Sequence, residues 1–147
     1  MLEADVPTVG RLELQSHSPW SLSSLVDEIE QERGLVLVAE STSRDKSVPV
    51  VVGWCACRYI VPEAELLKIA VNTCARRQGI ATELLKHLSR FLFQSSIETL
   101  FLEVRSQNQS ALKFYLKNGF LHIGERAKYY SNPDDNASLF KKEIVTI

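Results

Sequence analysis

The stretch LLKIAVNTCARRQGIA at residues 66–81 decides the fold. Its first six residues, 66–71, are nearly all apolar, which favours a strand. After a short connection, residues 79–93 repeat apolar side chains at helical spacing along one face and predict a helix. A strand that passes through a loop into a helix places unpaired backbone N–H groups and the positive end of the helix dipole at the loop. This arrangement is suited to binding an anion.

The loop RRQGIA at 76–81 narrows the kind of anion. Arg76 and Arg77 add positive charge beside the helix start, which suits a diphosphate better than a neutral ligand. Gly79 and Ala81 are small enough to let a phosphate approach the backbone. The alternative is that Gly79 only starts a surface helix, and the glycine alone does not separate the two interpretations.

The C-terminal half continues the alternation of strands and helices. TLFLEVR at 99–105 is nearly all apolar apart from its carboxylate and predicts an interior strand, joined to the strand before the loop by a right-handed crossover. Gly119 is a natural left-handed end for the helix before it. We expect a helix over 109–118 and closing strands over 120–129 and 137–145 around a turn at 131–135.

The N-terminal half predicts two helices and a hairpin. Helical spacing between residues 4 and 33 is interrupted at 16–19, where Ser18 is expected to cap a helix with Pro19 in its first turn and Gly34 to stop it. Apolar residues then alternate with polar ones or form short runs. We expect strands at 35–40 and 48–60 around a polar turn at 41–47, and a third strand over 65–72.

Composition excludes several classes of function. The 17 basic and 18 acidic residues nearly cancel, so nothing favours nucleic acid as a partner. The apolar runs are far shorter than the roughly 20 residues that span a bilayer. The N-terminus is acidic and does not resemble a secretory signal. We therefore expect a cytoplasmic protein of one domain, residues 1–147, without a membrane or nucleic-acid partner, and a monomer.

The cysteines and histidines indicate neither a disulfide nor a metal site. Cys55, Cys57 and Cys74 are odd in number and lack CxxC spacing, so we interpret them as buried reduced thiols. His87 and His122 have no neighbours with metal-ligand spacing. No metal is expected.

Two motifs together resemble the GNAT superfamily of acetyltransferases. Arg76-x-x-Gly79-x-Ala81 after an apolar strand looks like its acyl-CoA signature, Gln/Arg-x-x-Gly-x-Gly/Ala. LEVR at 102–105, Asn108 and ALKFYLKNGF at 111–120 are similar to the second half of that signature. The resemblance implies a mixed α/β fold in which about four helices flank a largely antiparallel sheet of six to seven strands with one parallel, splayed pair. It also implies a first strand, for which Met1-Leu2-Glu3 leaves little room.

The resemblance implies acetyl-CoA as the acyl donor. In that family the strand before the loop pairs its backbone with the pantetheine arm, and an extended amide chain can satisfy such a strand edge. Asn108 would hydrogen-bond the cofactor, although it could equally cap the helix that follows it. The implied cofactor residues are Ile69, Ala70, Val71, Arg76, Arg77, Gln78, Gly79, Ile80, Ala81, Thr82 and Asn108.

The same resemblance assigns a base to Glu103 and an acid to Tyr115. The chemistry needs both, because an amine attacks a thioester only when neutral and a thiolate leaves better when protonated. Glu103 stands among apolar residues and so is partly withdrawn from water; the alternative is an ion pair with Arg105 on the same strand face. Glu65 is a rival base. Tyr115, by its helical spacing, is otherwise a core residue.

The acceptor amine is the least determined part. An α-amine, with a pKa of about 8, is neutral in about one molecule in ten at pH 7, against roughly one in 2,500 for lysine, so an N-terminus is the easier acceptor. Family members that acetylate the N-terminal alanine of a ribosomal protein resemble this chain in four stretches: HSPWS at 17–21, IAV at 69–71, LEVR at 102–105, and Tyr129-Tyr130 ahead of Pro133. The last two are the more diagnostic. The expected acceptor-binding residues are Trp20, Glu65, Tyr129 and Tyr130. Another protein N-terminus, a lysine, a small amine, or a catalytically silent acyl-CoA-binding module remain alternatives.

Overall fold

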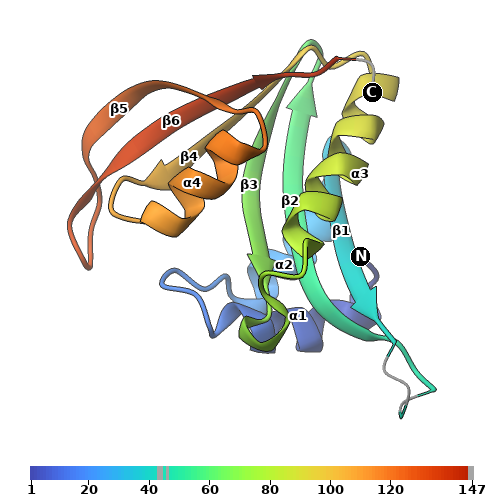
Figure 1. Cartoon of the computed structure of the whole chain (residues 1–147). Helices are drawn as coiled ribbons and strands as arrows, with labels where there is room; N and C mark the ends of the chain where they lie inside the picture. The colour runs from blue at the N-terminus through green and yellow to red at the C-terminus, as the bar shows by residue number, and fades with distance from the viewer. Residues whose placement is uncertain (43–44, 46, 146–147) are drawn as a thin grey trace. The chain divides into compact units, whose positions relative to one another are not determined.

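The computed structural model describes residues 1–42, 45 and 47–145 and contains a mixed sheet with helices (Figure 1). The hydrogen-bonded strand order is β1-β2-β3-β4-β6-β5. The strands are β1 (Gly34–Ser41), β2 (Val50–Ile60), β3 (Glu63–Val71), β4 (Thr99–Arg105), β5 (Leu121–Tyr130) and β6 (Asp135–Glu143). The helices are α1 (Val6–Glu13), α2 (Leu22–Ile29), α3 (Ile80–Gln94) and α4 (Gln109–Lys117), with short 3-10 turns η1 (Glu3–Asp5) and η2 (Thr73–Ala75).

The chain divides into two compact units. Unit 1 consists of Met1–Arg58 and Lys68–Ser89, and unit 2 of Tyr59–Leu67 and Arg90–Ile147. β3 and α3 each contribute to both units. The expectation of a single domain stays a prediction.

Unit 1 is built on the antiparallel pair β1 and β2, in which Val38 faces Trp54. Successive residues of a strand point to opposite faces, so the side chains of β2 pack on both faces of the sheet. Trp54 lies on the side of the α1–α2 loop, where its ring contacts that of Trp20 at 5.5 Å. Gly53 points to the other side, where an added Cβ would lie 3.2 Å from Ile80 of α3. Helices therefore cover both faces of this part of the sheet.

Unit 2 is built on three antiparallel strands, with β6 between β4 and β5. α4 packs on this sheet through Tyr115, whose ring centroid lies 5.4 Å from that of Phe120 and 6.1 Å from that of Phe140. β3 adds the only parallel contact described: residues 63–65 pair with residues 99–101 of β4. The predicted parallel pair in a mainly antiparallel sheet is thus confirmed, with pairing over three residues of each strand.

Most predicted elements lie within two residues of the observed ones, but the start of α2 is wrong. Ser21, not Ser18, is its N-cap and accepts a hydrogen bond from the Ser24 N–H at 3.1 Å. Pro19 precedes the helix, because the residues before Ser21 are held by contacts outside the helix: the Ser18 carbonyl accepts from Lys68 at 2.9 Å. Residues 16–20 therefore stay irregular.

Three further expectations need correction. Gly34 does not stop α2, which ends at Ile29; it opens β1, where an added Cβ would lie 2.8 Å from the Gln31 Cβ. Cys74 is exposed in η2, whereas Cys55 and Cys57 are buried as expected. The first strand implied by the family is not found among the described residues before β1, which form η1, α1 and α2. The predicted turn at 41–47 lies partly outside the described residues.

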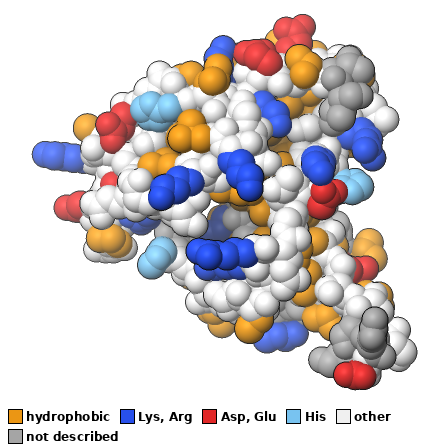
Figure 2. All heavy atoms as spheres, viewed as in Figure 1, with side chains coloured by type: hydrophobic (Ala, Val, Ile, Leu, Met, Phe, Trp, Pro, Cys, Tyr) orange, Lys and Arg blue, Asp and Glu red, His pale blue; other side chains and the backbone are white. Residues whose placement is uncertain are grey.

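The surface follows the balanced composition. Figure 2 shows basic and acidic side chains mixed with hydrophobic ones over the viewed face, as a formal charge of −1 suggests. No helix among the described residues is long and apolar enough to cross a membrane.

Candidate active site

The loop between η2 and α3 turns through two residues in the left-handed region of backbone conformation. Arg77 and Gly79 both have positive φ, 62° and 80°. For Gly79 this carries no steric cost, because glycine lacks the Cβ that crowds the left-handed region. The Arg76 Nε donates to the Val71 carbonyl at 3.2 Å, so this side chain folds back onto the end of β3. The loop thus reverses direction between the strand and the helix.

α3 begins directly after this loop. The Glu83 N–H bonds to the Gly79 carbonyl at 3.0 Å, so the first N–H groups of the helix belong to Ile80, Ala81 and Thr82, which have no earlier turn to bond. Arg77 and Gln78 are exposed beside them. Unit 1 therefore contains the strand, loop and helix start that the sequence predicts, and the anion-binding role of these residues stays a prediction.

The strand before the loop is paired on one side with β2. The Asn72 N–H bonds to the Val52 carbonyl at 2.8 Å, and an added Cβ at Gly53 would lie 3.2 Å from the Ala70 carbonyl oxygen. Ile69, Ala70 and Val71 are half-buried in β3. Their predicted backbone pairing with an acyl carrier remains compatible with this placement and untested.

In unit 2, Glu103 lies at the centre of a polar cluster on β4. Its side chain is 21% exposed, and its Oε1 lies 3.3 Å from the Arg126 Nη2 of β5. The Tyr129 hydroxyl is hydrogen-bonded to the same carboxylate, and this bond is the main reason that the pKa of Tyr129 is raised. Glu103 thus has the proton-accepting contacts of a candidate base.

Arg105 does not pair with Glu103, contrary to the alternative drawn from strand spacing. Its guanidinium donates to the Pro133 carbonyl at 2.8 Å and the Ser131 carbonyl at 3.3 Å and lies 4.4 Å from the centroid of the Tyr130 ring. It therefore holds the β5–β6 turn. The Tyr130 side chain is partly buried, and this burial raises the pKa of its hydroxyl.

Glu65, the rival base, belongs to the same neighbourhood. It is opposite Phe101 in the parallel register, so it lies at the same level of the sheet as β4. Its negative charge also contributes to the raised pKa of Tyr129. Two carboxylates and Tyr129 are thereby brought together in unit 2.

Tyr115 is 8% exposed, with its ring against Phe120 and Phe140. It fulfils the core role expected from helical spacing, and the proposed acid role is untested. Asn108 caps α4, because its Oδ1 accepts from the Ala111 N–H at 3.2 Å. The helix-cap alternative is therefore confirmed, and a cofactor contact would have to use the rest of its side chain.

Sequence patterns missed a buried charge cluster around Glu13. This carboxylate is fully buried at the end of α1 and accepts from the Trp54 Nε1 at 3.0 Å and the Trp20 N–H at 2.9 Å. Lys68 lies 3.2 Å from it. The partners are 7, 41 and 55 residues away in sequence, beyond the reach of any local pattern. An acidic residue at a buried position of an amphipathic helix was the one available signal.

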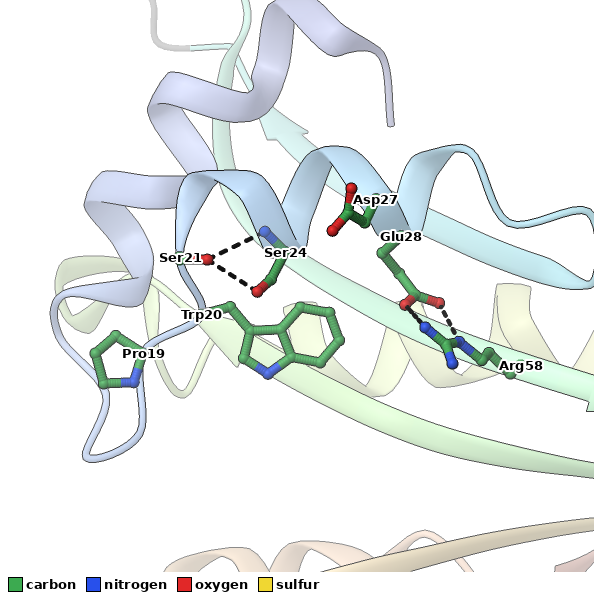
Figure 3. A pocket seen from close by; sticks show the side chains of 7 residues that line it. All are labelled: Pro19, Trp20, Ser21, Ser24, Asp27, Glu28 and Arg58. Carbon is green, nitrogen blue, oxygen red and sulfur yellow. Dashed lines mark hydrogen bonds and ion pairs between the residues drawn. The ribbon is translucent and has the colours of Figure 1, made fainter.

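Trp20 also lines an open groove of about 510 Å³ in unit 1. Figure 3 shows Trp20 and Ser24 on the same side of α2 as Glu28, which forms two hydrogen bonds to Arg58. The remaining lining residues are Pro19, Ser21 and Asp27. Among the described residues, no group of three or more His, Cys, Asp or Glu side chains has the arrangement of a metal site.

Residues 7–120 match the Acetyltransferase (GNAT) family. The chain belongs to this family. The likeness extends beyond these residues: the crystal structure of the ribosomal-protein-S18-alanine N-acetyltransferase from Escherichia coli is similar with a TM-score of 0.85, 27% identity and coverage of 100% of this chain and 92% of that one.

Curated relatives extend the match over nearly the whole chain. The [ribosomal protein bS18]-alanine N-acetyltransferase of Haemophilus ducreyi is 32% identical over 91% of this chain and 88% of its own. The protein of the same description from Escherichia coli K12 is 31% identical over 88% and 84%. This GNAT protein is accordingly an acetyl-CoA-dependent N-acetyltransferase.

Proposed function

We propose that the enzyme transfers the acetyl group of acetyl-CoA to the N-terminal α-amine of a ribosomal protein whose first residue is alanine. The observation that carries this proposal is the similarity, over nine-tenths of the chain, to an enzyme with that described acceptor. The cluster of Glu103, Tyr129 and Glu65 supports it, because two carboxylates and a phenol suit the binding and deprotonation of one ammonium group.

The reaction we propose is a direct attack. Glu103 accepts a proton from the bound ammonium, and the neutral nitrogen forms a bond to the thioester carbonyl carbon. The tetrahedral intermediate then collapses with cleavage of the C–S bond. Tyr115 donates its proton to the departing sulfur, which leaves as the thiol of coenzyme A, and the nitrogen loses its second N–H proton to water as the amide forms. Water returns a proton to the Tyr115 phenolate and Glu103 releases the proton that it accepted, so that one proton is set free in each turnover.

In unit 1, the loop of residues 76–79 and the first turn of α3 bind the diphosphate of acetyl-CoA. Backbone N–H groups of Ile80 to Thr82 supply the donors, and Arg77 adds positive charge. The edge of β3 at residues 69–71 pairs with the pantetheine amides. These contacts hold the donor without using any side chain of the acid–base cluster.

The test is an acceptor panel with the purified full chain. Peptides beginning with Ala, Ser or Met are compared with an N-terminally blocked Ala peptide that contains lysine, and with spermidine, while thiol release from acetyl-CoA is followed. We expect the free Ala peptide to react fastest and the blocked peptide to be inert. Release with spermidine alone, or equal rates with the blocked peptide, would refute acceptance of an α-amine.

A further inference from the structure

The α1–α2 loop, residues 14–21, is held in place within unit 1 by hydrogen bonds to a buried ion pair. Glu13 has no exposed surface, and one of its carboxylate oxygens accepts the backbone N–H of Trp20. The other oxygen accepts the indole N–H of Trp54, whose ring is itself completely buried. This carboxylate consequently ties the far end of the loop to the centre of β2.

Lys68 fastens the middle of the same loop. Its ammonium group lies 3.2 Å from Glu13 and donates to the Ser16 hydroxyl at 3.2 Å and the Ser18 carbonyl at 2.9 Å. The side chain is 16% exposed, so these contacts are little screened by water. The three acceptors satisfy all three N–H groups of the ammonium.

A second fastening lies on the other side of the cofactor strand segment. The Gln15 Oε1 accepts from the Thr73 N–H at 2.9 Å. Residues 69–71 are the segment assigned above to the acyl carrier. Lys68 comes directly before this segment, and Thr73 comes two residues after it. The α1–α2 loop is thus held at both ends of the strand segment that binds the donor.

A buried ion pair is a poor way to gain stability, because the desolvation of two charges offsets most of their attraction. What such a pair does well is to select one arrangement of the groups around it. Here the groups selected are the backbone of Ser18 and Trp20, which line or adjoin the groove. A loop fixed before binding loses less conformational entropy when a ligand arrives.

We propose that Glu13 and Lys68 are positioning residues that preorganise the α1–α2 loop for the acceptor peptide. This inference rests on the proposed function, since it assigns the loop to acceptor binding. Neither side chain takes part in proton transfer. Their contribution is to hold Trp20 in the orientation that receives the peptide.

The experiment compares Lys68→Met and the double variant Glu13→Gln/Lys68→Met with wild type. Met keeps the length of the side chain without its charge, and the double variant removes the buried negative charge that Lys68→Met alone would leave unpaired. Val9→Ala is the matched control, because Val9 is fully buried in the same helix and its side chain has no polar group that could hold the loop. Each protein is measured for acceptor and acetyl-CoA KM, kcat and thermal unfolding.

We expect both Lys68 variants to raise the acceptor KM about tenfold, equivalent to about 1.4 kcal/mol, with the acetyl-CoA KM nearly unchanged. Val9→Ala should lower Tm and leave both KM values as in wild type. A folded double variant with the wild-type acceptor KM would overturn the proposal. So would an equal rise in both KM values, which indicates general disruption.

Acrylamide quenching of tryptophan fluorescence separates this inference from the proposed function. The chain has two tryptophans, and only Trp20 lies in the loop. Loss of Lys68 should increase quenching of Trp20 while buried Trp54 stays protected. If wild type acetylates no peptide, the proposed function fails, but quenching still reports on the loop. Unchanged quenching in a folded Lys68→Met protein overturns the anchoring itself.

Discussion

Replacing Glu103 with glutamine removes one negative charge and one proton acceptor while keeping the shape of the side chain. The change acts on a defined cluster: the Arg126 guanidinium loses its partner at 3.3 Å, and the Tyr129 hydroxyl loses a charged acceptor. An amide oxygen can still accept the phenol hydrogen bond. The fold of unit 2 should therefore survive, and the effect should fall on the chemistry.

The loss of the base and the loss of a charge each determine part of the expected effect of Glu103→Gln, the first on kcat and the second on the acceptor KM. A positioned general base contributes about 10²- to 10⁴-fold, so kcat should fall by that factor. In addition, an ammonium about 4 Å from a carboxylate gains ~1 kcal/mol in water-like surroundings and ~4 kcal/mol at an effective dielectric constant of 20. Arg126 is 58% exposed and Glu103 21% exposed, which places the site between these limits. A rise in acceptor KM of about tenfold or more should accompany the fall in kcat.

The assay is the pH dependence of kcat/KM with an Ala-initiated peptide. An α-amine is neutral in about one molecule in ten at pH 7 and in about nine in ten at pH 9, so solvent replaces the base as pH rises. The ratio of wild-type to Glu103→Gln rates should therefore shrink by up to about tenfold over this interval. Glu65→Gln is the control, because it removes a neighbouring carboxylate from the same cluster.

One result would refute the assignment directly: Glu103→Gln within about fivefold of wild type while Glu65→Gln loses two orders of magnitude or more. That outcome would move the base to Glu65. A constant ratio across pH would show that Glu103 orients the acceptor without accepting its proton.

Three further outcomes follow from the same structure. Tyr115→Phe should lower kcat at least tenfold with unchanged equilibrium binding of acetyl-CoA, and full turnover would exclude it as the acid. A thiol reagent should modify exposed Cys74 in the native protein but not Cys55, because burial raises the pKa of the Cys55 thiol to about 12; immediate reaction of both would contradict this burial. The hydrogen bond to Glu103 raises the pKa of Tyr129, since the neutral phenol donates it and the carboxylate opposes a phenolate, so NMR titration of Glu103→Gln should give a lower Tyr129 pKa than wild type.

The local sequence pattern was sufficient to predict the bounds of α3 and β4. α3 begins one residue after the predicted start, because its apolar spacing runs uninterrupted from Ile80 and Gly79 cannot be mistaken for a helix interior. β4 matches residue for residue, since a short apolar run between polar turns leaves no other register. The cap formed by Asn108 is predictable from sequence, because a side-chain hydrogen bond to the start of a helix joins residues that are close in the chain.

Contacts between distant residues explain the errors. Ser18 and Ser21 are equally good caps by composition. The hydrogen bonds from Lys68 to the Ser18 carbonyl and from the Trp20 N–H to Glu13 hold the residues before Ser21 outside the helix. Likewise, strand spacing predicts an ion pair between Glu103 and Arg105. The observed partner of Glu103 is Arg126 of β5, a strand that is not a hydrogen-bonded neighbour of β4. Sequence thus located the catalytic candidates but not the charges that surround them.

The Glu13 cluster also sets an order of events during folding. The hydrogen bond between its carboxylate and Trp54 joins residues 41 positions apart, and the bond between Lys68 and Ser16 of the α1–α2 loop joins residues 52 positions apart. Contacts of such separation form late, because the entropy of closing a long segment of chain must be lost before any of them is gained. During synthesis, α1 therefore emerges with an acidic side chain that water still solvates. We expect this loop to become ordered only once β3 has left the ribosome, after most of unit 1 has been made.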